Sequence, residues 1–364
     1  MDVVNRLAAQ CRAVCVISVD STEPHDEILA SSVRSIGLPD IWQNGMGPLL
    51  QALNTFEPTH VVLRFPSLEV LKWAEDKSIS VLVTLADSFN LRAGLRGLKD
   101  RWRNRALAKL LNRDFVTFVG NHNIAAAEEL LTIGVDPEKV IPWDWPRIAE
   151  PSEYKTKLAP NSKRKTIICV GHVSEAKGVG DVIRALAADD SLKETTELRV
   201  LGDGDLEGMR ALAANLGLQK GVTFAGKVPF ADFGPAMHEA DAVIVYSQHD
   251  YGEGLPGTVY LGFAARTPLI LSDHPMFLRY FTHRKDALIV PQRSPKLLAS
   301  AIKELFADTE LFAKLSASGA EAFGRICHPV HWGEVVERGL RRTDADLKWL
   351  REQTMPYWTL RARP

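Results

Sequence analysis

The segment YGEGLPGTVYLGFAARTPLIL, residues 251–271, combines a turn, a helical pattern and the start of a strand. Gly254 and Gly257 flank Leu255 and Pro256, and glycines in such a turn let backbone amides approach a ligand closely. The apolar run that follows predicts a helix over 257–266, and RTPLIL leads into a strand. Because the first turn of a helix offers unbonded amides to an anion, the segment predicts a phosphate site at a helix start in an α/β protein.

The same alternation of strand and helix extends through the chain. Short runs rich in Val, Ile and Leu, without polar alternation, are typical of strands buried on both faces. Strands are predicted at 13–19, 60–65, 79–85, 115–120, 139–143, 166–171, 197–202, 221–226, 242–247, 267–272 and 287–291. Helices are predicted at 67–76, 93–112, 123–133, 179–188, 206–216, 230–240, 257–266 and 295–307. This order predicts two parallel, doubly wound sheets in tandem.

The domain boundaries follow from a change in composition. Residues 147–164 are rich in Pro, Ser and charged side chains, as a linker is. We therefore expect a Rossmann-like domain over 1–150, a linker over 151–164, a second Rossmann-like domain over 165–330 and a helical segment over 331–364. Two such domains in one chain predict a ligand cleft at the carboxyl ends of their strands.

Composition excludes several classes of protein. The chain has 364 residues with 44 Lys and Arg against 45 Asp and Glu, a balance that gives no argument for a nucleic-acid partner. The four cysteines are scattered without metal-ligand spacing, which favours a reducing compartment. No signal peptide is recognisable, and no apolar run approaches the roughly 18 residues of a spanning helix. We expect a cytoplasmic protein without a metal site.

The loop VGHVSEAKG, residues 170–178, follows a predicted strand and carries candidate phosphate ligands. Gly171 ends the strand, and Lys177 stands just before the predicted helix, where the helix amides also favour an anion. His172 adds a further donor. A surface lysine in an ordinary strand–helix loop is the alternative reading of Lys177.

Two further loops after strands are weaker signals. Gly202 and Gly204 in LGDGDLEG, residues 201–208, allow a tight turn between strand and helix. Lys227 and Val228 leave the strand FAG on the same edge, where backbone groups can contact a base. An ordinary connecting loop explains either segment equally well.

Taken together, five segments resemble the donor domain of the retaining glycosyltransferases of family 4, the group 1 glycosyltransferases. They are GHVSEAKG, LGDGDL, FAGKV, EADAVIVYS and EGLPGTVYLGFAARTPLILSD, in that order and spacing. The resemblance covers about 165–330. It implies the GT-B fold, an α/β architecture of two Rossmann-like doubly wound domains facing a central cleft, with 331–364 crossing back to the first domain.

The resemblance also implies roles for individual residues. Lys177 contacts the donor diphosphate, and Glu253 binds hydroxyls of the donor sugar. The remaining donor-binding residues implied are Gly171, His172, Gly202, Lys227, Val228, Gly254, Leu255, Pro256, Gly257 and Thr258. The implied reaction moves a hexose-type sugar from a nucleotide diphosphate sugar, as co-substrate, to a glycan or lipid-linked acceptor. Positive side chains and the helix dipole stabilise the leaving diphosphate, so no metal and no other cofactor is expected.

Three positions depart from the family pattern. His172 replaces the family's Arg, Leu261 replaces a Glu that grips the nucleotide ribose, and Ala86 replaces a His in the acceptor domain. Losing a charged hydrogen bond to a ribose costs about 1.5–3 kcal/mol if the partner stays buried. A GT-B pseudoenzyme that binds a glycan or a partner glycosyltransferase without turnover therefore stays open as an alternative.

In the first half, Asp87 follows the predicted strand 79–85 in the sequence VTLADSFN. The resemblance places this loop near the donor sugar, which makes Asp87 a candidate catalytic residue beside Lys177 and Glu253. A role in capping the following helix is the alternative. The aromatic side chains of PWDWPR, residues 142–147, either stack on a sugar or pack the domain junction, and the sequence does not decide between the two.

Residues 91–113 predict a basic amphipathic helix. They contain eight Lys or Arg and one acid, Asp100, and apolar side chains recur at helical spacing. The apolar positions are Leu91, Leu95, Leu98, Trp102, Ala106 and Leu110. Such a helix either lies on the anionic inner face of a membrane as a peripheral contact or turns its apolar stripe to the core.

Overall fold

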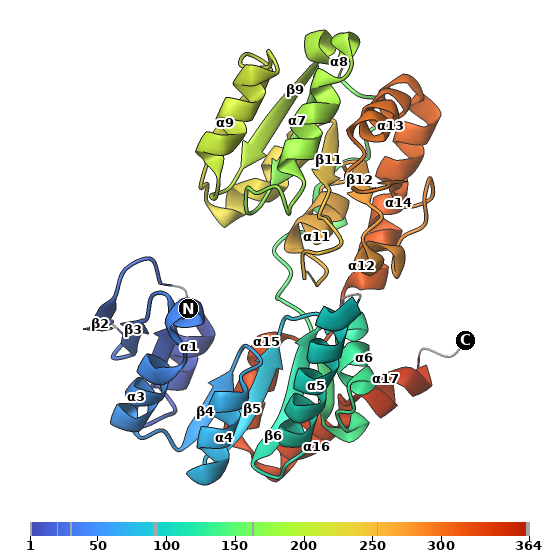
Figure 1. Ribbon diagram of the computed structural model, residues 1–364. Helices are drawn as coiled ribbons and strands as arrows, with labels where there is room; N and C mark the ends of the chain where they lie inside the picture. Colours follow the sequence, from blue (N-terminus) through green and yellow to red (C-terminus); the bar gives the residue numbers. More distant parts are fainter. Residues whose placement is uncertain are drawn as a thin grey trace. The chain divides into compact units, whose positions relative to one another are not determined.

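The chain divides into two units, each with its own parallel sheet (Figure 1). This computed structural model describes residues 2–19, 21–29, 31–89, 94–161, 164–252 and 254–361. The first unit comprises Met1–Trp145 and His328–Pro364, and the second comprises Pro146–Cys327. The C-terminal segment thus belongs to the first unit, and the segment 151–164, expected as a linker, lies within the second.

The second unit is built on a six-stranded parallel sheet in the order β10-β9-β8-β11-β12-β13. Its strands are β8 (Lys165–Val170), β9 (Thr196–Leu201), β10 (Val222–Gly226), β11 (Ala242–Val245), β12 (Leu269–Ser272) and β13 (Leu288–Val290). The strand order reverses between β8 and β11, so these strands flank the topological switch point at which doubly wound sheets bind ligands. The predicted doubly wound sheet is confirmed for this unit.

Helices cover both faces of this sheet. They are α7 (Val179–Ala187), α8 (Asp190–Thr195), α9 (Leu206–Asn215), α10 (Phe233–Glu239), α11 (Gly257–Ala264), α12 (Pro275–Leu278), α13 (Pro295–Ala307) and α14 (Thr309–Ile326), with the 3-10 turns η2 (Pro151–Glu153) and η3 (Phe230–Asp232). One buried cluster joins the strands to α7, α9 and α13. Since β8–α7–β9 and β11–α11–β12 run in opposite directions along the sheet, right-handed crossovers place α11 on the other face.

Local sequence explains where several of these helices begin. The side chains of Asp189, Asp205 and Asp308 each accept a hydrogen bond from a backbone amide in the first turn of α8, α9 and α14. An aspartate at this position satisfies an amide that has no partner within the helix.

The first unit contains a four-stranded parallel sheet whose strands follow chain order. Its strands are β4 (His60–Leu63), β5 (Ser80–Leu85), β6 (Val116–His122) and β7 (Val140–Trp143). The connecting helices α4 (Leu68–Asp76), α5 (Gly94–Leu111) and α6 (Asn123–Thr132) lie on one face, because successive right-handed crossovers run in one direction (Figure 1). The strand order has no reversal, in contrast to the doubly wound sheet that was expected for this half.

The opposite face of this sheet is covered by helices from both ends of the chain. The helices there are α1 (Asp2–Ala8), α15 (Trp332–Arg341) and α16 (Asp344–Glu352), followed by α17 (Met355–Arg361). Leu82, Phe118 and Ile141 of the sheet share a buried cluster with Val336 and Leu350 of the C-terminal helices. In a doubly wound sheet, the reversal of strand order places connecting helices on this second face. Here helices of residues 328–364 cover it instead.

A separate three-stranded sheet precedes these elements. It has the order β1-β3-β2, with strands β1 (Cys15–Ser18), β2 (His25–Ile28) and β3 (Arg34–Gly37). The strand predicted at 13–19 is confirmed as β1, but it pairs in parallel with β3 and not with β4–β7. The short elements α2 (Ile41–Asn44), α3 (Gly47–Phe56) and η1 (Pro137–Lys139) complete the unit.

Helix α5 turns a different face to the core from the one its apolar pattern suggests. Leu107, Ala108 and Leu111 are buried, together with the polar Asp100 and Asn104. Of the predicted apolar stripe, Leu98 is 52% exposed and Trp102 is 74% exposed. The core-facing interpretation of this stripe is therefore wrong for Leu98 and Trp102, whereas Leu110 packs against the buried cluster of the unit. Among the residues described, no helix has the length and apolar character needed to cross a bilayer.

Candidate functional site

A small cavity lies at the switch point of the second unit, beside the carboxyl ends of β8 and β11. Its lining includes Gly171, His172, Lys177 and Thr258, together with Val245 at the end of β11. The loops after β8 and before α11 thus bring together residues that are far apart in the chain. Lys177 and Thr258, for example, are separated by 81 positions. This is the position at which an open α/β sheet binds its ligand.

Glycines allow two loops to meet at this edge. Gly202 has a φ of 137°, and a Cβ added there would overlap the carbonyl oxygen of Gly171. The amide of Gly171 donates to the carbonyl of Leu201 at 2.9 Å, which continues the pairing of β8 with β9. Gly202 therefore serves the close approach of the two loops and is not part of the cavity lining.

Lys177 lies at the start of α7. Its amide donates to Ser174 Oγ at 3.3 Å, and its Nζ lies 4.7 Å from the ring centroid of Tyr251. Partial burial lowers the pKa of Lys177 from its ordinary value to about 8, because the charged form loses solvation. Gly178 follows with a φ of 74°, and a Cβ there would overlap the carbonyl oxygen of Tyr246. The lysine is thus held close to the loop after β11.

The first turn of α11 is tied to the end of β8. Thr258 Oγ1 donates to the carbonyl of Val170 at 3.1 Å, and Pro256 precedes the first helical residue. A Cβ added to Gly257 would meet nothing within 4 Å, so open space adjoins the start of the helix. A helix start next to Lys177 combines two features that stabilise an anion, a positive side chain and the helix dipole.

The other residues of the turn are placed differently. Leu255 is 1% exposed, so its side chain anchors the turn in the protein interior. Gly254 and Pro256 are not among the residues that line the cavity. Glu253, predicted to bind the donor sugar, lies outside the described residues. Leu261 is 5% exposed and belongs to the buried side of α11.

Lys227 and Val228 are not brought to the cavity. They follow β10, which lies two strands away from β8 in the sheet. Lys227 is exposed, Val228 is half-buried, and neither lines the cavity at the switch point.

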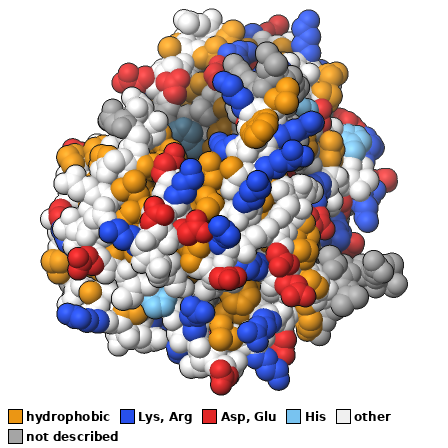
Figure 2. Space-filling model, turned by 60° about the horizontal axis from the view of Figure 1, so that its bottom comes forward, with side chains coloured by type: hydrophobic (Ala, Val, Ile, Leu, Met, Phe, Trp, Pro, Cys, Tyr) orange, Lys and Arg blue, Asp and Glu red, His pale blue; other side chains and the backbone are white. Residues whose placement is uncertain are grey.

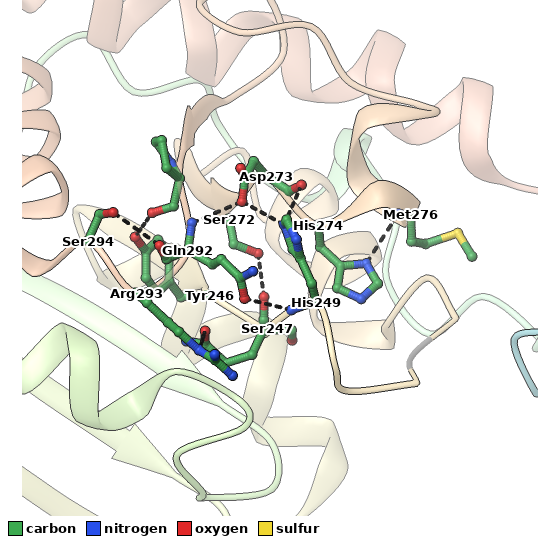
Figure 3. Close-up of polar contacts among 12 residues, drawn as sticks. Tyr246, Ser247, His249, Ser272, Asp273, His274, Met276, Gln292, Arg293 and Ser294 are labelled. Atoms are coloured by element: carbon green, nitrogen blue, oxygen red, sulfur yellow. Dashed lines mark hydrogen bonds and ion pairs between the residues drawn. The ribbon is translucent and has the colours of Figure 1, made fainter. Parts of the chain in front are cut away.

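A polar network that the sequence did not reveal holds the loop before residue 253 (Figure 3). His249 Nε2 lies 2.8 Å from Asp273 Oδ1, and the His249 amide donates to Gln292 Oε1 at 2.7 Å. The Gln292 amide in turn donates to Asp273 Oδ1 at 2.9 Å. These residues follow β11, β12 and β13, so three strand ends are linked. The only sequence signal was the polar pairs Asp273-His274 and Gln292-Arg293 directly after predicted strands.

His274 fixes the same loop from β12. Its Nδ1 accepts the Met276 amide at 3.2 Å, so we assign the ring proton to Nε2, which donates to the Tyr251 carbonyl at 3.1 Å. Burial lowers the pKa of His274, which favours this neutral form. Tyr251, whose ring lies beside Lys177, is thereby held in place.

In the first unit, Asp87 lies at the carboxyl end of β5 and is half-buried. Its amide donates to Asn121 Oδ1 at 3.3 Å, and Asn121 Nδ2 donates to its carbonyl at 2.9 Å. Burial raises the pKa of Asp87, and the charge of Arg103 opposes this shift. Ala86 beside it is exposed. The capping alternative for Asp87 involves residues 90–93, which lie outside the described residues.

Across the described ranges, no cluster of three or more His, Cys, Asp or Glu side chains has the arrangement of a metal site.

Residues 151–322 match the family described as glycosyl transferases group 1. The chain is 28% identical over 258 residues to a GDP-mannose-dependent alpha-(1-6)-phosphatidylinositol monomannoside mannosyltransferase of Mycobacterium tuberculosis, covering 65% of this chain and 66% of that protein. It is 31% identical over 179 residues to a phosphatidyl-myo-inositol mannosyltransferase of Mycobacterium leprae, covering 49% of this chain and 46% of that protein. The chain thus spans less than two-thirds of the length of these relatives.

The fold also has solved counterparts. The Anabaena protein Alr3699/HepE, crystallised in complex with UDP and glucose, superposes with a TM-score of 0.62 at 16% identity. The superposition covers 86% of this chain and 87% of that one.

Proposed function

Because the chain belongs, through residues 151–322, to the glycosyl transferases group 1 family and has the GT-B fold, we propose that it is a glycosyltransferase of family 4. It moves a hexose-type sugar from a nucleotide diphosphate sugar to a glycan or lipid-linked acceptor. We propose further that it retains the anomeric configuration and needs no metal. The observation that carries the proposal is the cavity in which Lys177 adjoins the start of α11, at the switch point of the sheet.

The proposed chemistry uses this arrangement for the leaving group. The bond between the sugar and the diphosphate breaks, and the diphosphate takes both electrons of that bond. Lys177, His172 and the amides at the start of α11 stabilise the charge that develops on it. The acceptor hydroxyl attacks from the face of the departing group, and a phosphate oxygen takes its proton. Glu253 binds hydroxyls of the transferred sugar, and Asp87 lies on the acceptor side.

Mutation of the cavity tests the assignment. We expect Lys177→Ala and Glu253→Ala each to lower turnover at least tenfold, with unchanged far-UV circular dichroism. Lys314→Ala, which removes an exposed lysine of α14 in the same unit, serves as the matched control. Wild-type rates in both cavity variants would refute the site.

Calorimetric titration with UDP-, GDP- and ADP-sugars identifies the donor. The names of both mannosyltransferase relatives make a mannose donor the first to test. Buried Leu261 supplies no polar group for a ribose, so we expect the ribose to be bound by other groups. Binding to none of these donors would favour the pseudoenzyme over the enzyme.

We also propose that α5 docks on the cytoplasmic face of an anionic membrane, where a lipid-linked acceptor is presented. Exposed Leu98 and Trp102 lie on this helix among basic side chains. The face of the molecule drawn in Figure 2 carries basic, acidic and exposed hydrophobic side chains intermingled. Apolar side chains that enter the interface and cations that attract acidic lipids act together in such helices.

Vesicle co-sedimentation tests this contact. Burying one large apolar side chain contributes about 1.5–3 kcal/mol, so Trp102→Ser lowers the partition onto phosphatidylglycerol vesicles about tenfold or more. Ile28→Ser, which removes a side chain that is 69% exposed on β2, is the control. Equal binding to phosphatidylglycerol and phosphatidylcholine vesicles, or no effect of Trp102→Ser, would contradict docking through α5.

A further inference from the structure

The carboxyl edge of the first unit's sheet carries two tryptophans that enclose one arginine. Arg64 follows β4, Trp145 lies two residues after the end of β7, and Trp332 begins α15. Arg64 Cζ lies 5.2 Å from the ring centroid of Trp145 and 4.9 Å from that of Trp332. The two indole rings are 5.8 Å apart. The guanidinium therefore contacts both aromatic faces at once.

Hydrogen bonds fix both tryptophans. Trp332 Nε1 donates to Thr84 Oγ1 on β5 at 3.1 Å, which sets the orientation of its ring. The Trp145 amide donates to Asp144 Oδ1 at 2.8 Å. The Trp332 amide donates to the Asp144 carbonyl at 2.9 Å, so one residue holds the backbone of both tryptophans.

Asp144 is itself fixed by a buried network. Its Oδ1 lies 3.0 Å from His122 Nε2, and its Oδ2 accepts the His328 amide at 3.0 Å. Asp144, His122 and His328 are each 5% exposed or less. Because these bonds are made between residues of the protein itself, they hold the backbone of the aromatic pair in place for binding.

Arg64 differs from other arginines of the chain in its electrostatic surroundings. Arg34 and Arg341 each donate to a carboxylate, Asp26 and Asp346 respectively. Within the described part of the chain, no hydrogen bond or ion pair engages the guanidinium of Arg64. Partial burial beside the two rings lowers the pKa of Arg64, although the residue as a whole stays exposed to solvent. A guanidinium of this kind has donors available for a bidentate contact with an oxyanion.

Trp145 supplies the second element of a binding site. It is 39% exposed, which leaves part of a flat indole ring open to solvent. Such a ring packs against the apolar C–H face of a sugar, and its position at the carboxyl end of a parallel strand is where ligands of such sheets lie.

We propose that Arg64, Trp145 and Trp332 bind an acidic pyranose, with Arg64 holding a phosphate or carboxylate and Trp145 stacking on the sugar ring. The inference deepens the proposed function, because in a glycosyltransferase such a ring belongs to the acceptor. The two tryptophans come from segments 187 positions apart in the chain, so this site exists only in the folded first unit.

Calorimetry on the full chain, without donor, tests the site directly. The probes are glucose 6-phosphate, glucuronate, methyl glucoside and inorganic phosphate. We expect at least one acidic pyranose to bind tenfold or more tightly than methyl glucoside and inorganic phosphate, and the tighter of the two identifies the anion as phosphate or carboxylate. Binding of neither acidic pyranose above the level of these two probes would overturn the proposal.

Variants then assign the binding to these residues. Arg64→Gln lowers the affinity for the acidic pyranose at least tenfold, and Trp145→Leu lowers it while leaving the weak affinity for inorganic phosphate unchanged. The control is Arg113→Gln, since Arg113 is an exposed arginine of the same unit whose Nε lies 3.0 Å from Glu75. Near-UV circular dichroism verifies the fold of each variant. Unchanged affinity in correctly folded Arg64→Gln would refute the site.

Donor titrations separate this proposal from the proposed function. Arg64→Gln keeps the wild-type affinity for the nucleotide sugar, because the residues that line the donor cavity all belong to the second unit. A wild-type protein that binds the acidic pyranose but no nucleotide sugar would refute the proposed function alone. One that binds the nucleotide sugar but no acidic pyranose would refute this site alone.

Discussion

The lowered pKa of Lys177 predicts how donor binding depends on pH. In the free protein this pKa is about 8, whereas an ordinary lysine stays protonated well above pH 9. A diphosphate next to Nζ favours the charged form, so the bound protein has a higher pKa than the free one. Above pH 8 donor binding must therefore be accompanied by uptake of a proton.

The magnitude follows from the titration of the free protein. At pH 9, one unit above a pKa of about 8, roughly one-tenth of the free protein carries a protonated Lys177. The affinity for the nucleotide sugar should accordingly fall about fivefold to tenfold between pH 7 and pH 9. Below pH 7 Lys177 contributes no further change, because it is already protonated.

Calorimetry in buffers of different ionisation enthalpy measures both the dissociation constant and the number of protons taken up. Lys177→Arg is the control, since arginine keeps its charge throughout this range and any remaining pH dependence belongs to the ligand. Lys177→Met should bind the donor weakly and show the same residual dependence as the arginine variant. Equal affinities at pH 7 and pH 9 in the wild type, without proton uptake, would show that Lys177 does not contact the diphosphate.

Three further predictions concern stability. Gly202→Ala should lower Tm much more than Gly217→Ala. Both glycines have a positive φ, but a Cβ would overlap backbone atoms only at Gly202. Equal shifts of the two melting curves would contradict this prediction. Burial lowers the pKa of His328 to about 4, so between pH 6.5 and 4 the unfolded state binds more protons than the folded state. The free energy of unfolding should therefore decrease by up to about 3 kcal/mol as pH falls from about 6.5 to 4. Urea titrations of wild type and His328→Gln measure this decrease, and a parallel decrease in both proteins would exclude His328 as the cause. Leu261→Glu should destabilise the second unit by several kcal/mol, because a carboxylate would lose its hydration at a position that is 5% exposed. Leu261→Met, which keeps an apolar side chain of similar volume, should cost less than about 1.5 kcal/mol. Equal Tm values of the two variants in thermal melts would show that this position is open to solvent.

The sequence predicted the strands well because burial on both faces leaves continuous apolar runs. Ile167 and Ile168 of β8, both 0% exposed, are examples. It missed β2 and β3, whose residues include His25, Asp26 and Arg34 and carry no such signal. It also mistook the inward face of α5, because that face buries Asp100 and Asn104 while Trp102 points outward.

The candidate site was accessible to sequence reasoning only where loops carry local signals. Glycines and a lysine at strand ends pointed to Gly171, Lys177 and the turn before Thr258, which the fold brings to one cavity. The bonds between His249 and Asp273 join different strand ends, and no local pattern encodes which strands become neighbours. Leu255 is predicted to bind the donor through its backbone amide, and the burial of its side chain is compatible with that role.

The placement of residues 328–364 in the first unit determines the order in which the protein can mature on the ribosome. The second unit, residues 146–327, is continuous in sequence and is synthesised before residues 328–364, which belong to the first unit. The first unit begins synthesis earlier but waits for α15 and α16, and until then Leu82, Phe118 and Ile141 remain without their cover. The half of the protein that is made first is therefore the last to finish folding, and a truncated product ending before residue 328 would present an apolar sheet face to chaperones and proteases.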